Sequence, residues 1–86
     1  MPSTPLEAQL RLRARELISD GRLRCIPHYR TWGGRGNNEP CALCDVVIKG
    51  DEVEYEIESI GADSARLYRF HFLCHDAWQH ECAAAE

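Results

Sequence analysis

The sequence Cys41-Ala42-Leu43-Cys44 is followed, after 26 intervening residues, by His71-Phe72-Leu73-Cys74. The first stretch has the pattern C-x2-C and the second has the pattern H-x2-C. Thiolate sulfur and imidazole nitrogen in two such pairs are typical ligands of tetrahedral zinc. We therefore predict one zinc site whose four protein ligands close the coordination shell, as in a structural rather than a catalytic site. The predicted ligands are Cys41, Cys44, His71 and Cys74.

Other cysteine and histidine residues leave alternatives to this ligand set. His75 could replace His71 as the fourth ligand, because the two are four residues apart on a predicted helix. A second site could use a C-x2-H pair and two residues near the end of the chain, namely Cys25, His28, His80 and Cys82. Otherwise Cys25 and Cys82 are expected to be small buried apolar side chains, with the two histidines on the surface. The alternative to any zinc is a set of reduced, free cysteines beside a hydrogen-bonded core histidine.

Length and composition predict one small domain, 1–86, that needs a cross-link. A chain of 86 residues buries too little surface for a large core, and metals or disulfides usually stabilise such domains. Five cysteines cannot all pair with one another. The N-terminus has no signal-sequence pattern, and no apolar run approaches the ~20 residues of a membrane span. We therefore expect a protein of the reducing cytoplasm that avoids membranes and is a monomer or weak dimer.

Charge is distributed unevenly along the chain. Residues 1–40 carry seven arginines and four acids, or +3, whereas residues 41–86 carry three basic and ten acidic residues, or −7. Nucleic-acid binding depends on neutralising phosphates, so only the N-terminal half could supply that attraction. The candidate contacts to a protein partner or to nucleic acid are Arg11, Arg15, Arg30, Trp32 and Arg35.

The first predicted element is an amphipathic helix over residues 5–19. Thr4 is a candidate N-cap, Pro5 suits the first helical position, and Glu7 completes a capping box. Apolar side chains then recur at helical spacing until Asp20-Gly21 provides a stop signal. We expect this apolar stripe to pack on the zinc module, with a partner-binding or dimer helix as the alternative.

Residues 22–40 are rich in glycine, proline and asparagine, and we expect an irregular loop that leads to the metal site. Trp32 lies in its middle, either as an anchor to the core or as an exposed ring that stacks on a base or peptide. The run Gly33-Gly34-Arg35-Gly36 lacks the flanking strand and lysine helix of a phosphate-binding loop, so we do not assign it that role.

Strand patterns occupy the middle of the C-terminal half. Three apolar residues alternate with four glutamates in Glu52–Glu58, which predicts an antiparallel strand with one buried face and one solvated glutamate face. Ala65–Phe70 is expected to pair with it, its arginines facing the glutamates, and Val46–Ile48 to form a short strand. From His71 onward, helical spacing predicts a terminal helix on which Trp78 packs against the hairpin.

A C-x2-C turn, a hairpin and two ligands at the start of a helix resemble a treble-clef zinc finger over residues 40–82. The second ligand pair is similar to the first zinc site of LIM domains. It is also similar to the poly(ADP-ribose)-polymerase-type finger, through Ile48 after the second cysteine and Phe70 before His71. The whole chain resembles small uncharacterised bacterial proteins. The expected fold is α+β, with an N-terminal helix, Gly-rich loop, zinc knuckle, antiparallel hairpin or three-stranded sheet, and C-terminal helix.

Three classes of function are compatible with these patterns. The first is a non-catalytic zinc module that binds a protein partner, favoured by the closed ligand shell, the acidic sheet face and the separate amphipathic helix. The second is a nucleic-acid-binding finger that uses the arginine-rich half and Trp32. The third, a metal-dependent nuclease, would need an open metal site with a paired histidine and asparagine, which the sequence does not present. We therefore expect a binding module and not an enzyme.

Overall fold

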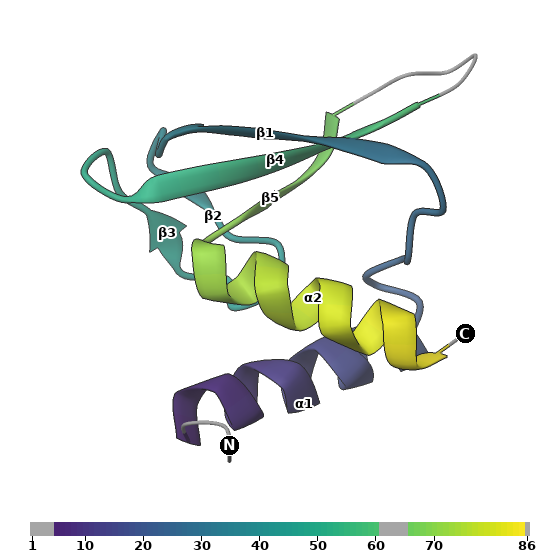
Figure 1. Cartoon of the computed structure of the whole chain (residues 1–86). Helices are drawn as coiled ribbons and strands as arrows, with labels where there is room; N and C mark the ends of the chain where they lie inside the picture. The colour runs from purple at the N-terminus through teal and green to yellow at the C-terminus, as the bar shows by residue number, and fades with distance from the viewer. Residues whose placement is uncertain (1–4, 61–65, 86) are drawn as a thin grey trace.

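The computed structural model describes residues 5–60 and 66–85, and these form two helices and five strands in an α+β arrangement. Figure 1 shows α2 lying between α1 and the strands. The predicted fold class, a small antiparallel α+β domain with a helix at each end, is confirmed. In chain order the elements are α1 (Pro5–Ser19), β1 (Tyr29–Arg35), β2 (Glu39–Pro40), β3 (Val47–Ile48), β4 (Val53–Ser59), β5 (Arg66–Phe70) and α2 (Phe72–Ala85).

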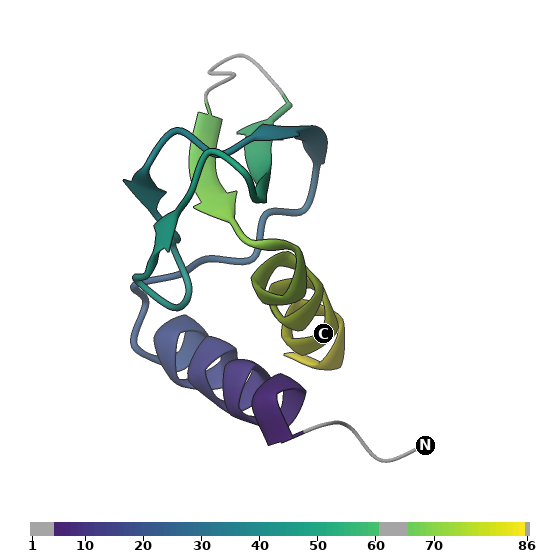
Figure 2. The ribbon, with the colours of Figure 1, turned by 90° about the vertical axis from the view of Figure 1, so that its left-hand side faces the viewer.

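The strands form two antiparallel sheets. The larger has the order β1-β4-β5, with Tyr29 opposite Ser59 and Tyr55 opposite Phe70. The smaller contains β2 and β3 and encloses the C-x2-C turn. Figure 2 shows this turn next to α1, so the metal-ligand stretch lies between the N-terminal helix and the main sheet.

β1 corrects the prediction that residues 22–40 form only an irregular loop. Its backbone pairs with β4 along its whole length, because cross-strand hydrogen bonds outweigh the weak strand propensity of glycine. Gly36 follows β1 and is buried, and a Cβ atom there would collide with the carbonyl oxygens of Lys49 and Ile48. Gly36 is therefore needed for close approach of two backbone segments and not for loop flexibility.

α1 matches the predicted helix over residues 5–19 and packs its apolar stripe on α2. Ala14 and Leu17 are buried in that contact. Gly21 has a φ of 78°, the left-handed conformation expected of the residue that ends a helix. The proposed N-cap, Thr4, and the turn at 61–64 lie outside the described residues.

Trp78 occupies the centre of the core between α2 and the main sheet. Its ring centroid lies 5.3 Å from that of Phe70 and 5.1 Å from that of Tyr29, and its Nε1 donates to the Arg24 carbonyl at 3.1 Å. This confirms the predicted packing of Trp78 on the hairpin. The buried apolar core comprises Ala14, Leu17, Leu23, Leu43, Ile48, Ile57, Phe70, Ala77 and Trp78, together with Cys41 and Cys74.

The glutamate face of β4 is not solvated as predicted. Glu54 is only 3% exposed, and the Arg69 Nε lies 3.8 Å from its Oε1 and 3.9 Å from the Glu56 Oε1. Burial, with hydrogen bonding from Glu56, raises the pKa of Glu54. β4 is the central strand, so its glutamates lie beside side chains of neighbouring strands, such as Arg69 on β5. The predicted opposition of arginine and glutamate is confirmed for Arg69.

A disulfide joins Cys25 to Cys82, whose Cα atoms are 5.5 Å apart. It corrects two expectations, the second metal site with His28 and His80 and the alternative of free buried thiols. Cys25 lies after α1 and Cys82 near the end of α2, 57 residues away, so only the packing of the two helices brings them together. His80 instead lies on the surface, with Nε2 3.4 Å from the Asp76 Oδ1.

Candidate metal centre

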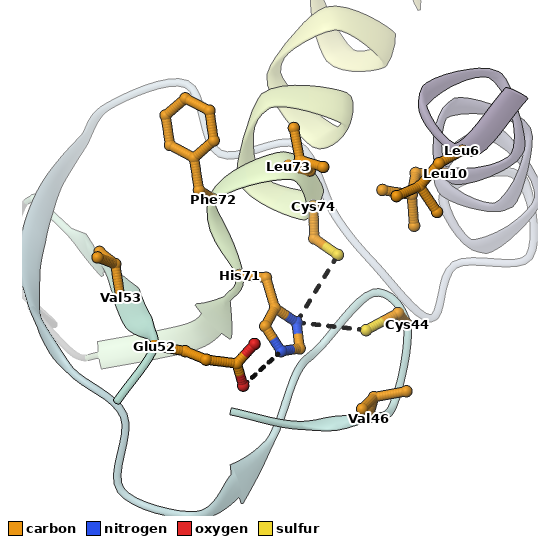
Figure 3. Close-up of a pocket in the computed structure, with 10 residues that line it drawn as sticks. All are labelled: Leu6, Leu10, Cys44, Val46, Glu52, Val53, His71, Phe72, Leu73 and Cys74. Atoms are coloured by element: carbon orange, nitrogen blue, oxygen red, sulfur yellow. Dashed lines mark hydrogen bonds and ion pairs between the residues drawn. The ribbon is translucent and has the colours of Figure 1, made fainter. Parts of the chain in front are cut away.

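The four predicted ligands converge in one cluster. The ligand atoms of Cys41, Cys44, His71 and Cys74 all lie within 4.8 Å of one another. The first two side chains come from the turn between β2 and β3, and the other two from the junction of β5 with α2. Figure 3 shows the imidazole of His71 directed at two of the sulfur atoms, with Nδ1 3.4 Å from Cys44 Sγ and 4.0 Å from Cys74 Sγ.

Backbone hydrogen bonds shape the turn that carries the first two ligands. The Cys41 N–H donates to the Val46 carbonyl at 2.9 Å, and the Asp45 N–H donates to the Cys41 carbonyl at 3.0 Å. Asp45 has a φ of 66°, a left-handed conformation that aspartate tolerates better than most residues. The Ala42 N–H donates to the Arg69 carbonyl at 2.7 Å, which ties the turn to β5 close to the second ligand pair.

Leu43, between the two cysteines of the turn, connects the metal centre to the core and to α1. Its side chain is fully buried. Its N–H donates to Cys41 Sγ at 3.5 Å, a contact that favours the thiolate. Its carbonyl oxygen accepts a hydrogen bond from the Nε of Arg13 on α1. The N-terminal helix is therefore held against the ligand turn as well as against α2.

Glu52 is a member of this site that the sequence analysis did not identify. Its Oε1 lies 3.7 Å from the Nε2 of His71, on the ring edge away from the sulfur atoms, and accepts the Lys49 N–H at 2.8 Å. Ligand histidines commonly direct their second ring nitrogen toward such a carboxylate, which fixes the ring orientation and tautomer. The available signal was the position of Glu52 directly after the Lys49-Gly50-Asp51 turn, at the start of the glutamate row.

The three thiols influence one another's protonation. A hydrogen bond from Cys74, together with backbone hydrogen bonds, lowers the pKa of Cys41 to about 4. The same bond to Cys41, followed by burial, raises the pKa of Cys74, and burial raises the pKa of Cys44. Three neighbouring sulfurs, two of them buried, therefore do not all ionise by themselves at neutral pH. A divalent cation would supply the positive charge that allows all three to act as thiolates.

The size of the cluster fits a tetrahedral zinc ion. Bonds of about 2.3 Å to sulfur and about 2.0–2.1 Å to nitrogen imply separations of about 3.6 Å between nitrogen and sulfur. The distances of 3.4 and 4.0 Å from His71 Nδ1 bracket that value. Three sulfurs and one imidazole nitrogen are also typical donors for zinc, whereas magnesium and calcium prefer oxygen donors.

His75, the alternative ligand, is partly buried against aromatic residues rather than placed in the cluster. Its ring stacks on Tyr55, with centroids 5.1 Å apart and planes 20° apart. Burial lowers the pKa of His75, and its Nε2 has no hydrogen-bond partner among the described residues. The structure therefore brings His71, and not His75, to the three cysteines.

Arg11 and Arg15, two of the candidate contact residues, bind a buried acid within the chain. Their Nε atoms lie 3.1 and 2.8 Å from the two carboxylate oxygens of Glu81 on α2. The hydrogen bond from Arg15, with a second from Arg11, lowers the pKa of Glu81 despite its burial. These two arginines fasten α1 to α2.

The remaining candidates, Arg30, Trp32 and Arg35, lie on β1. Trp32 is 44% exposed and does not anchor the strand to the core. Its Nε1 donates to Glu58 at 3.3 Å, and the Arg30 guanidinium lies 5.6 Å from its ring centroid. Figure 1 shows α1 and β1 on opposite sides of α2, so these residues and the α1 arginines come from separate parts of the fold.

The chain matches no protein-family model, no curated protein and no solved structure. The treble-clef, LIM and polymerase-type resemblances therefore stay predictions. Within the described residues, neither helix has the length and apolar character that crossing a membrane requires.

Proposed function

We propose that the chain is a non-catalytic zinc-binding module in which one structural Zn²⁺ holds the fold together. The observation that carries this proposal is the convergence of four ligand atoms, from two segments far apart in the sequence, within 4.8 Å. A bound zinc would cross-link the turn between β2 and β3 to the start of α2. The order of ligand turn, hairpin and helix also supports the resemblance to treble-clef fingers.

Four protein ligands leave no coordination position for a water molecule. When bound, the zinc ion supplies charge neutralisation and a cross-link rather than an activated hydroxide. Around it, the Leu43 N–H stabilises the thiolate of Cys41, and Glu52 orients the ring of His71. Cys41 and Cys74 are buried, whereas Cys44 and His71 are partly exposed. This arrangement supports a binding role rather than catalysis.

The partner that we propose for this module is a protein. Binding to nucleic acid has less support, because Arg11 and Arg15 both pair with Glu81, and Glu58 lies 3.8 Å from Arg30. The chain is also acidic overall, with a net charge of −4. An acidic surface is unfavourable for phosphate backbones and compatible with a protein partner.

Metal content of matched cysteine variants tests the zinc proposal. We expect purified wild-type protein to contain about one zinc per chain, and Cys74→Ser to lose the metal and most of its folded structure, since structural zinc contributes on the order of 10 kcal/mol in finger peptides. The matched control is the double variant Cys25→Ser/Cys82→Ser, which removes two cysteines outside the cluster and should keep the zinc. Retention of one zinc by Cys74→Ser, or wild-type protein that folds without metal, would refute the proposal.

A further inference from the structure

An apolar groove of about 510 Å³ lies over the metal cluster. It is formed by four segments of the chain, namely α1, the ligand turn, the start of β4 and the start of α2. Figure 3 shows the side chains that line it. Its apolar walls, which we call the metal groove, are formed by Leu6, Leu10, Val46, Val53, Phe72 and Leu73.

The walls of the metal groove are unusually exposed for apolar side chains. Leu6, Val46, Val53 and Phe72 are each more than half exposed, and they come from four different segments. Large apolar side chains exposed singly are ordinary, but a group that converges on one groove marks a binding surface. These four are half of the eight large apolar side chains that are exposed among the described residues.

The floor of the metal groove is acidic. Cys44, His71 and Cys74 line it, and a zinc ion with three thiolates and a neutral histidine has a net charge of −1. The partly exposed carboxylate of Glu52 adds a second negative charge beside His71. No lysine or arginine is among the described residues that line the groove. A ligand that fills it must therefore supply the positive charge itself.

The charged floor lies between two apolar walls. In Figure 3, Val53 and Phe72 lie on one side of His71, and Leu6 and Leu10 lie on the other, beyond the Cys74 sulfur. A complementary ligand would present apolar, basic and apolar groups in that order. A cation held between apolar surfaces interacts with carboxylate and thiolate charge more strongly than it would in open water.

We propose that the metal groove binds a segment of a partner protein that carries a lysine or arginine between two apolar side chains. The inference rests on the proposed zinc, which supplies part of the negative floor. The basic group would lie near Glu52 and the Cys44 thiolate, and the apolar side chains would pack on the two walls. Charge complementarity also disfavours an anionic membrane surface as the occupant.

Peptide selection followed by affinity measurement tests this proposal. Random 12-residue peptides displayed on phage would be selected on the zinc-loaded protein, and enriched peptides would be synthesised with a fluorophore. We expect enriched peptides to carry a basic residue flanked by apolar ones. Leu6→Asp and Val46→Asp should each weaken binding by about tenfold, and Ile60→Asp, an equally exposed residue outside the groove, by less than about twofold.

Several results would overturn the proposal. These are the absence of any enriched peptide, enriched peptides without a basic residue, or equal binding by wild type and Val46→Asp. Sedimentation that shows a dimer dissociated by Leu6→Asp would instead assign the groove to a second copy of this chain. Zinc content is measured on every sample. Missing zinc contradicts the proposed function, whereas one zinc per chain without peptide binding contradicts this inference alone.

Discussion

The Nε2 atom of His71 lies 3.7 Å from the Oε1 of Glu52, while Nδ1 of the same ring faces the sulfur atoms of Cys44 and Cys74. A carboxylate beside the second ring nitrogen is the usual arrangement around a ligand histidine, where it favours binding of the metal through the other nitrogen. Glu52 also joins the start of β4 to the junction of β5 with α2. Four ligands alone would not fix the orientation of the imidazole ring.

Glu52→Gln should lower zinc affinity without unfolding the protein. Removing a carboxylate that orients a ligand histidine typically costs about tenfold or more in metal affinity. The measurement is competition for zinc with a chromophoric chelator at neutral pH. Glu39→Gln, an exposed glutamate on β2, is the matched control and should have wild-type affinity. Equal affinities for the two variants would show that Glu52 has no part in orienting His71.

Loss of the Cys25–Cys82 disulfide should destabilise the fold while leaving the metal cluster complete. The linked positions are 57 residues apart in sequence, and closing a loop of this length removes about 4 kcal/mol of conformational entropy from the unfolded state. The double variant Cys25→Ser/Cys82→Ser should lose about that much unfolding free energy in urea. Wild type treated with a phosphine reductant should then match the variant. If the reductant has no effect on wild type, the two cysteines are not bridged in solution.

Glu81→Gln should lower the free energy of unfolding by about 2 kcal/mol, because it weakens the attachment of α1 to α2. The effect is not larger because Arg11 and Arg15 are partly exposed, and solvent screens their charges. The pKa of Glu81 is lowered in the folded protein, so its contribution is present above the unfolded pKa and is lost as pH falls through the folded pKa.

Urea unfolding between pH 3 and 7 measures this effect, with Glu16→Gln on the exposed side of α1 as the control. The difference between wild type and Glu81→Gln should be largest near neutral pH and shrink in acid. A difference that does not depend on pH would mean that the ion pair makes no contribution.

Glu54→Gln should stabilise the protein at neutral and higher pH, by about 1 kcal/mol. Burial raises the pKa of Glu54, so the wild-type protein is most stable while this group is protonated and loses stability as pH rises through the folded pKa. Gln cannot ionise and avoids that loss. Thermal unfolding at pH 5 and pH 8 provides the measurement, and a Glu54→Gln protein that is less stable than wild type at pH 8 would contradict the assignment.

Local spacing was enough to predict much of this fold. The helix over residues 5–19, the alternating strand, the terminal helix and each of the two ligand pairs depend on residues close in sequence. The spacing of apolar residues indicates such elements directly, because side chains on one face of a helix or strand recur at a fixed interval. Each ligand pair was predictable because its two residues, in a tight turn or one helical turn apart, are already near each other.

What depended on tertiary contacts was not predictable in this way. Tyr29–Arg35 is a strand because β4 supplies its hydrogen-bond partners, not because of its own propensity. Glu54 is buried because strands lie on both sides of it. The approach of Glu52 to His71 likewise requires two segments to meet after folding.

The sequence by itself determined the two ligand pairs, the two helices and the alternating strand, because each is specified by residues within one or two turns of the chain. Only the tertiary structure decided that Cys25 bridges to Cys82, that α1 is held by Glu81, and that an apolar groove lies over the metal cluster. These features join segments that are far apart in sequence, and their geometry depends on how the helices and sheets pack.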